Sequence, residues 1–483
     1  MRNLLFTSLS VLLLLAGCGK GEEGKDVLAR VGNRAIDMKE LNRSYTLRPE
    51  WKRGQTELQA YLTQLDRLIT QKIYAQEAEN VHLDADSLLQ AHFQFLKQKE
   101  MIKGLYRKEV REKVRLDSTE VRRLYEWSKR KIDFEYIFTR DSVRCARYAN
   151  ELAGHAVRSM TFAGDSSARF GRREGTKVGD EPPELERLLY TSPLQAVQGP
   201  VRMQGGYVAL KVTGGGQEKF LSENDFILQR QKVESLITGR QTDSVSEAYV
   251  VFLMQDKNLR LNAPVFWNVA DHFYRRVKEA HVDQMKIQSV NVTSDELRLL
   301  DDDLGPLGDA VVATHRGGYL TVRQLMDALS TMPGSLRPRV RTPENLKAAI
   351  GMIVRNQYLL KEAERQGLER DSEVLYEYGL QRDETLALAY YDYRRKDVQV
   401  TPDDVELFKK QSRISEEQVF FKLNMTTLAR DARTDSILAG DLPHLKTQYV
   451  VTVDTARVRS LLKTPDAVLN ENPLRMFVRE IFQ

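Results

Sequence analysis

Cysteine and histidine are scarce in this chain of 483 residues, which contains two cysteines and seven histidines. No group of Cys and His residues has the spacing of metal ligands, so the sequence predicts no metal site and no other cofactor. Cys145 lies in the helical pattern SVRCARYANELAG and is expected to be a small buried hydrophobe. The alternative, a reactive thiol, would need a His base, and His155 is poorly placed for that role.

An excess of charge of one sign is also missing. The chain has 73 Lys and Arg against 68 Asp and Glu, a net charge of +5, and no long basic run interleaved with aromatics. This argues against a nucleic-acid partner. Residues 95–131 alone are strongly basic, which suits either a solvated helical face over a groove or attraction to anionic headgroups or acidic clients. No Gly-x-Ser-x-Gly, HExxH, P-loop or dinucleotide-binding motif occurs.

Long apolar runs are absent except at the N-terminus. Arg2 precedes a mainly apolar stretch from Leu4 to Ala16, and LAGC (residues 15–18) closes it. Thirteen residues are too few to cross a bilayer as a helix, so the pattern predicts an export signal, residues 1–17. The LAGC stretch resembles the bacterial lipobox, which implies lipid attachment to Cys18. The alternative is an uncleaved anchor with a coincidental cysteine.

Lipidation of Cys18 would leave Cys145 as the only free thiol, so no internal disulfide is expected. Residues 18–26 are rich in glycine and charge and are expected to form a flexible tether. Gly19 is not the Asp that tends to retain lipoproteins in the inner membrane, which favours the outer membrane in an organism that has two. The protein is therefore predicted to be exported and anchored to a membrane on the side that faces the periplasm.

The sequence pattern changes several times along the chain. Residues 27–130 start as a short strand, with Asp37 as a helix N-cap, and continue as helices. A β-rich stretch with glycine-rich loops follows, ending in GPVRMQGGYVALKVTG, and a turn-rich acidic stretch occurs at 293–309. These changes predict a helical domain (27–130), a small α/β domain (131–214), a helical connector (215–292), a second helical domain (293–412) and a C-terminal segment (413–483).

The second half of the chain repeats the first. At an offset of 284, DMKEL matches TVRQL and DSTEVRRLYE matches TPDDVELFKK. At an offset of 285, QEAENVHLDAD (76–86) matches KEAERQGLERD (361–371). Apolar positions also match at that offset: Leu65, Leu68, Ile69 and Ile73 correspond to Ile350, Ile353, Val354 and Tyr358. FEYIF (134–138) against VFFKL (419–423) and ELAG (151–154) against ILAG (437–440) are fainter. They predict a truncated copy of the small domain within 413–483. Coincidence between amphipathic helices is the alternative.

Taken together, these stretches resemble the parvulin-type foldases and chaperones of the bacterial envelope, the SurA-like and PrsA-like proteins. VLARVGNRAIDMKELNRSY…LITQKIYAQEAENVHLDAD is similar to their helical chaperone domain. Residues 131–214 are similar to the prolyl-isomerase domain, with ELAG, MTFAGDSSARFG and a Gly-x-x-x-Gly at 175–179. The resemblance implies an α+β fold that is mostly helical, with a SurA-like helical domain, here duplicated, and a small parvulin-like domain.

The resemblance also points to candidate site residues. The two histidines of the family's pocket fall on Tyr136 and Val208, and Phe421 takes the place of Tyr136 in the fainter second copy. The barrier to X–Pro rotation is about 18–20 kcal/mol, and lowering it requires a pocket that fits the twisted amide. Tyr136 can still hydrogen-bond, whereas Val208 offers nothing polar. The remaining candidates are an apolar proline slot, or ordinary core, at Phe162, Met203 and Tyr207.

These observations predict an envelope-anchored chaperone that binds unfolded or nascent exported polypeptides, in a cradle between the helical segments. Its parvulin-like domain is expected to have lost efficient catalysis. One alternative is an active peptidyl-prolyl cis-trans isomerase, and another is a structural lipoprotein of an envelope assembly. The sequence does not indicate an oligomeric state. Candidate client contacts, each also explicable as core, are Trp51, Tyr61, Phe93, Phe95, Trp127 and Trp267.

Overall fold

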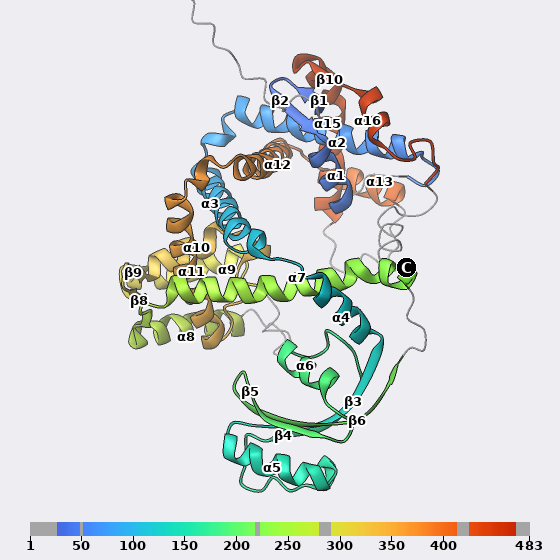
Figure 1. Cartoon of the computed structure of the whole chain (residues 1–483). Helices are drawn as coiled ribbons and strands as arrows, with labels where there is room; N and C mark the ends of the chain where they lie inside the picture. The colour runs from blue at the N-terminus through green and yellow to red at the C-terminus, as the bar shows by residue number, and fades with distance from the viewer. Residues whose placement is uncertain (1–26, 49–51, 218–222, 280–290, 413–424, 470–483) are drawn as a thin grey trace, which may run out of the picture.

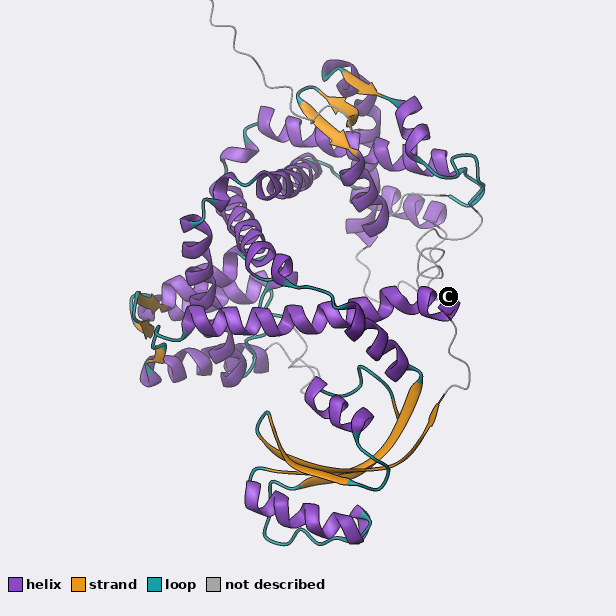
Figure 2. Ribbon diagram, in the orientation of Figure 1, coloured by secondary structure: helices purple, strands orange, loops and turns teal. Residues whose placement is uncertain are grey.

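The computed structural model describes residues 27–48, 52–217, 223–279, 291–412 and 425–469. These residues are mostly helical and include three small antiparallel sheets (Figures 1 and 2). The predicted fold class, an α+β chain that is mostly helical and carries a duplicated helical part, is confirmed.

The first half begins with a hairpin, β1 (Val27–Val31) and β2 (Arg34–Asp37), followed by α1 (Met38–Leu47), α2 (Glu57–Asn80) and α3 (Ser87–Glu109). Asp37 caps α1 as predicted, because its side chain accepts a hydrogen bond from the backbone N–H of Glu40. Thr56 and Gln59 form a capping box at the start of α2. The apolar face of α2 is buried under the hairpin, as its helical spacing predicted, at Leu65, Leu68, Ile69 and Ile73.

The second half repeats this order in β8 (Val311–His315), β9 (Gly318–Thr321), α10 (Val322–Thr331), α11 (Pro343–Arg365) and α12 (Ser372–Lys396). The repeat extends to strand register: Ala29 pairs with Ile36 as Ala313 pairs with Leu320, and both hairpins are irregular after their first pair. A residue in the left-handed conformation follows α2 and α11, at His82 and Gly367. In each half a short 3-10 turn comes next, and Asp86 or Asp371 then caps the following helix.

Each hairpin is completed by a third strand that comes from near the C-terminal end of the other half. Strand β10 (Val451–Val453) pairs with β1, and β7 (Arg260–Leu261) pairs with β8. The two pairings have equivalent registers, since Ala29 lies opposite Val453 and Ala313 opposite Leu261. Each half of the chain therefore donates one strand to the sheet of the other half, and the two halves are related by an approximate twofold axis.

The helices next to the exchanged strands are equivalent too. Strand β10 lies between α15 (Met425–Gln448) and α16 (Thr455–Leu461), and β7 lies between α7 (Glu223–Met254) and α8 (Ala263–Glu279). We call β1, β2, α1, α2, α15, β10 and α16 the first lobe. The second lobe consists of β8, β9, α10 and α11 with the end of α7, β7, α8 and α9 (Ser294–Leu304). Figure 1 shows the first lobe at the top and the second at the left.

The third helices of the two halves cross between the lobes. Helix α12 packs on α2, and α3 packs on α11 and α12. The two contacts use equivalent residues: Ala78 is buried with Leu386 and Tyr390, and Ala363 is buried with Met101 and Leu105. Because each half contributes a helix to the other lobe, the halves form one helical frame.

A small domain follows α4 (Ser118–Ser128) and precedes α7. It contains β3 (Arg130–Thr139), α5 (Ser142–Gly154), β4 (Arg169–Thr176), α6 (Pro183–Thr191), β5 (Val197–Met203) and β6 (Gly206–Gln217). The strand order is β4-β3-β6-β5, and α5 and α6 cover opposite faces of the sheet (Figure 1). The sheet of this domain begins at Arg130 and ends at Gln217.

The C-terminal segment differs from its prediction. Helix α15, strand β10 and α16 complete the first lobe, with Leu445 and Val458 in its core. The ILAG stretch lies in α15, which is equivalent to α7 and not to α5, so the expected truncated copy of the small domain is absent from the described residues. VFFKL, with Phe421, lies outside them. Only twelve residues separate α13 (Pro402–Ser412) from α15.

Two further expectations are corrected in detail. The acidic stretch at 293–309 is mainly helix α9, because Thr293 and Glu296 form a capping box and the leucines of one face are buried. The basic stretch at 95–131 is divided between α3 and α4. Much of its charge is paired, for example Lys103 with Glu100 and Arg107 with Asp371, which favours a solvated helical face over a strongly basic surface.

The equivalence of the halves predicts that the small domain is dispensable for folding. Replacing residues 129–222 with the twelve residues 413–424 should leave the helical frame folded, because α4 packs on α7 as α13 packs on α15. We expect its melting temperature to change by about 5 °C or less, measured by circular dichroism. Aggregation, or loss of a cooperative transition in this variant, would contradict the equivalence.

Candidate functional site

The small domain holds the residues predicted to form a catalytic site. Tyr136 on β3 and Val208 on β6 lie on the same face of adjacent strands, the face covered by α6. Met203 at the end of β5 joins the same apolar cluster. The positions matched to the histidines of the family are therefore neighbours in space, and a tyrosine and a buried valine occupy them.

Tyr136 is half-buried beside Gly171, the residue opposite it on β4. A side chain at Gly171 would approach the Tyr136 ring to 3.3 Å, so this glycine leaves room for the phenol. The Arg173 guanidinium lies 5.9 Å from the ring centroid, within reach of a cation–π contact. The Tyr136 hydroxyl forms no hydrogen bond with another described residue. Tyr136 therefore packs on the apolar cluster under α6, with the Arg173 guanidinium over its ring.

Phe162 and Tyr207 lie on the opposite face of the sheet. Phe162 packs with Tyr148 of α5 and stacks on Phe170 at 4.2 Å, and Tyr207 packs beside Cys145. The grouping of Phe162, Met203 and Tyr207 in one slot is therefore wrong. Tyr207 and Val208 are consecutive on a strand, so their side chains must point to opposite faces.

Neither the histidine nor the cysteine of the small domain lies beside Tyr136. Its only histidine, His155, is exposed at the end of α5, on the far side of the sheet from Tyr136. Cys145 is fully buried, and burial raises the pKa of its thiol to about 11, as expected of a structural cysteine. No group of acidic, His and Cys side chains that could hold a metal occurs among the described residues.

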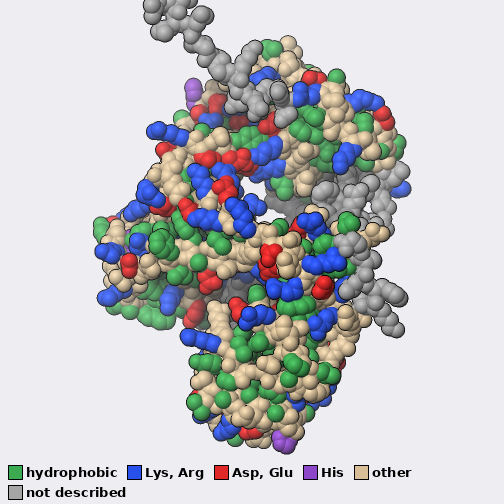
Figure 3. Space-filling view, in the orientation of Figure 1, with side chains coloured by type: hydrophobic (Ala, Val, Ile, Leu, Met, Phe, Trp, Pro, Cys, Tyr) green, Lys and Arg blue, Asp and Glu red, His purple; other side chains and the backbone are tan. Residues whose placement is uncertain are grey.

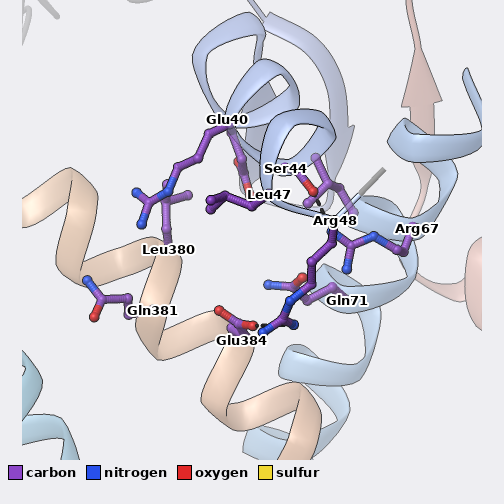
Figure 4. A pocket seen from close by; sticks show the side chains of 11 residues that line it. Glu40, Ser44, Leu47, Arg48, Arg67, Gln71, Leu380, Gln381 and Glu384 are labelled. Atoms are coloured by element: carbon purple, nitrogen blue, oxygen red, sulfur yellow. Dashed lines mark hydrogen bonds and ion pairs between the residues drawn. The ribbon is translucent and has the colours of Figure 1, made fainter. Parts of the chain in front are cut away.

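A pocket between α1 and α12 is shown in Figure 4. It is lined mainly by polar side chains that already bond one another, such as Arg48 with Glu384 at 3.0 Å and Arg67 with the Ser44 hydroxyl. Its volume is about 120 Å³, below the roughly 300–1,000 Å³ of typical small-molecule sites. This pocket belongs to the packing of the frame.

Of the six aromatic residues predicted as client contacts, Trp267 alone is exposed among those described. Phe93 is buried, Trp127 stacks on Tyr190, and Tyr61 stacks on Tyr45. Phe95 is partly buried against two core clusters, and Trp51 lies outside the described residues. Trp267 on α8 is 59% exposed.

Tyr274, which sequence reasoning missed, lies two turns along α8 from Trp267 and is 52% exposed. Residues seven apart share a helical face, so the two side chains leave one surface from Cα positions about 10 Å apart along the axis. The opposite face of α8 is buried through Phe266, Val269 and Phe273. Figure 3 shows apolar side chains gathered over this part of the second lobe and an opening through the molecule above α7. The i, i+7 spacing of two aromatics was the available signal.

The helix of the first lobe that is equivalent to α8 carries no exposed aromatic at this position. With Val458 equivalent to the buried Phe266, Arg459 of α16 takes the place of Trp267. Arg459 forms an ion pair with Asp466 at 2.5 Å. The fold therefore accepts a charged side chain where the second lobe exposes a tryptophan.

No helix of the described residues is both long enough and apolar enough to span a bilayer. Cys18 and the tether lie outside the described residues.

No protein-family model matches the chain, and no curated protein matches it either. Among solved structures, the chain is similar to one from a study of two structurally related SurA-like chaperones of Campylobacter jejuni, the virulence factor PEB4 and the periplasmic protein Cj1289. The identity is 15% and the TM-score 0.21, and the match covers 47% of this chain and 97% of that chain. This distant likeness does not assign a function.

Proposed function

We propose that the protein is an exported chaperone that binds apolar segments of unfolded polypeptides. The observation that carries the proposal is the exposed pair Trp267 and Tyr274, at a place where the first lobe has Arg459. A large aromatic side chain that is exposed to water, at a position where the fold also accepts arginine, favours a surface that a partner buries transiently. Asp271 and Arg275 lie beside the two rings and provide the mixed charge that keeps such a surface soluble.

The arrangement of the molecule supports the same function. In Figures 1 and 3 an opening lies between the first lobe and α7, and the small domain lies on the other side of α7. An extended chain could contact several weak apolar surfaces at once, and such binding requires no chemistry. The cradle between the helical segments stays a prediction, and the exposed face of α8 is the client contact that we propose.

The test is suppression of aggregation. The chain from Gly19 onward, which contains every described residue, should reduce light scattering when reduced, unfolded lysozyme is diluted from denaturant. We expect suppression at near-equimolar ratio, without nucleotide. If scattering is unchanged at a tenfold excess of folded protein, the chaperone proposal fails.

We further propose that the small domain binds clients without efficient prolyl isomerisation. The surroundings of Tyr136 offer its own hydroxyl, the Arg173 guanidinium and a buried Val208, so few polar groups can follow the twisting amide. The rate of cis–trans exchange of short Xaa-Pro peptides, measured by NMR, should stay at its uncatalysed value, with relaxation over tens of seconds at 25 °C. An acceleration abolished by Tyr136→Phe or Met203→Ala would favour the alternative, an active isomerase.

The location proposed from the sequence is the outer membrane, through lipid on Cys18. Strand β1 begins at Val27 in the first lobe, at the opposite end of the molecule from the small domain (Figure 1). Nine tether residues reach at most about 30 Å, so the first lobe would stay near the membrane. The small domain would then face away from the bilayer, toward arriving clients.

A further inference from the structure

A basic cleft lies where the small domain meets the helical frame. Its volume is about 720 Å³, and it is lined by α4, the neighbouring ends of β3 and β6, the turn after β4, and the first half of α7. We call it the junction cleft. None of the residues discussed above as candidate site residues lines it.

Four lysines line the junction cleft. Lys129 is buried and paired with Asp225 at 2.6 Å, so its charge is already balanced. Lys131, Lys177 and Lys232 are exposed and come from three separate elements. None of these three forms an ion pair with an acidic side chain of the described residues, in contrast to Lys103 and Lys113 on the helices nearby.

The wall of the junction cleft between these lysines is apolar. Leu124 and Val233 are buried at its base, and Val178 and Leu236 are partly buried beside them. Burial of apolar surface here would contribute about 25 cal/mol per Å². A ligand that fits must therefore present anionic groups next to apolar groups.

One rim of the junction cleft is a strand edge. Strand β5 pairs with β6 only as far as Lys211, so beyond Thr213 the only strand of the described residues that pairs with β6 is β3. Gly216 and Gln217 of this stretch line the cleft. A free edge offers backbone N–H and C=O groups to an incoming extended chain.

We infer that the junction cleft binds an extended polypeptide segment in which acidic and apolar residues alternate. The lysines recognise its carboxylates, the apolar wall receives the side chains between them, and the edge of β6 pairs with its backbone. This inference rests on the proposed chaperone function and names a class of client segment for it. A lipid headgroup shares the anionic chemistry, but it cannot pair with a strand edge.

The test uses two fluorescein-labelled twelve-residue peptides, one alternating Val and Glu and one alternating Val and Gln, with anisotropy as the readout. The chain from Gly19 onward should bind the Glu peptide about tenfold more tightly in 50 mM NaCl. The difference should largely vanish in 500 mM NaCl, where the screening length falls to about 4 Å. In the variant Lys131→Gln/Lys177→Gln/Lys232→Gln the two peptides should bind equally.

A matched control is Lys347→Gln/Lys410→Gln/Lys463→Gln, which removes the same charge from three exposed lysines elsewhere. It should keep the tenfold preference. Equal binding of both peptides by the unaltered chain, or equal loss in the control, would overturn the inference. Binding to phosphatidylglycerol vesicles with no preference between the peptides would also overturn it. Lysozyme is a basic client, so continued suppression of its aggregation would show that the chaperone function survives such a failure.

Discussion

Replacing Lys72 with methionine is expected to destabilise the helical frame by about 3–5 kcal/mol. Lys72 lies on α2, under the crossing of α12, and only 3% of its side chain is exposed. Its ammonium is 2.9 Å from a Glu40 carboxylate oxygen and 2.9 Å from Asp383 of α12. Methionine keeps the volume of the side chain but leaves the buried Glu40 carboxylate without its cation.

The pKa shifts at this site give the effect a pH dependence. Burial raises the pKa of Glu40, and Lys72 opposes that shift. Burial disfavours the charge of Lys72, yet its pKa is raised, because Glu40 and Asp383 both stabilise the ammonium. In Lys72→Met the pKa of Glu40 should rise further above its unfolded value, so the folded state binds a proton more readily than the unfolded state. The destabilisation should therefore be largest at pH 8 and shrink as the pH falls toward 5.

The chain supplies its own control for this variant. At the equivalent crossing in the other half, Glu40, Lys72 and Asp383 correspond to Gln324, Gln357 and Gln98. The variant Glu40→Gln/Lys72→Gln/Asp383→Gln removes all three charges, and Arg34, which also pairs with Asp383, keeps its second partner Glu79. It should therefore be more stable at pH 7 than Lys72→Met. Urea unfolding followed by circular dichroism measures both. A loss of less than about 1 kcal/mol in Lys72→Met would show that the buried ions do not hold the crossing.

The local features of the fold could be predicted from the sequence. Asp37 before an apolar helical pattern identified an N-cap, and the spacing of Leu65, Ile69 and Ile73 identified a buried face, because both depend on neighbours in sequence. The repeat could be predicted as well, since equivalent helices bury equivalent residues. These signals are carried by a few consecutive turns of helix.

The strand exchange could not be predicted. Strand β7 has two residues and β10 has three, too few to show the alternation of a strand. Val451 pairs with Val31, which is more than 400 residues away, and only the pseudo-symmetric structure reveals that partner. Because the sequence does not reveal this pairing, residues 413–483 were interpreted as a remnant of the small domain.

The candidate site was predicted in part. The resemblance placed Tyr136 and Val208 together, and the structure has them on one face of neighbouring strands. Strand parity should have excluded Tyr207 from that face, since it is adjacent to Val208. Exposure of Trp267 could not be derived from the sequence, because an aromatic residue on an amphipathic helix is usually buried.

Changing Trp267 to arginine is expected to abolish most of the proposed chaperone activity while leaving stability nearly unchanged. Truncating a central tryptophan at a binding surface costs about 2 kcal/mol or more, which weakens binding by roughly thirtyfold. We expect at least about tenfold more protein to be needed to suppress lysozyme aggregation. Stability should change by no more than about 0.5 kcal/mol, since Trp267 is exposed and Arg459 occupies the equivalent place on α16.

A control of matched exposure lies in the same lobe. Tyr319 on β9 is 58% exposed, and the equivalent residue in the first lobe is Ala35. Tyr319→Ala removes an aromatic ring of similar exposure away from α8, so it should suppress aggregation as well as the unaltered chain. If Trp267→Arg and Tyr319→Ala weaken suppression equally, client binding depends on exposed aromatic area in general. If neither weakens it, the α8 face is not the client surface, and binding must depend on the small domain or the junction cleft. A selective loss in Trp267→Arg, with an unchanged urea midpoint, would mean that one lobe of a symmetric frame has been specialised for clients.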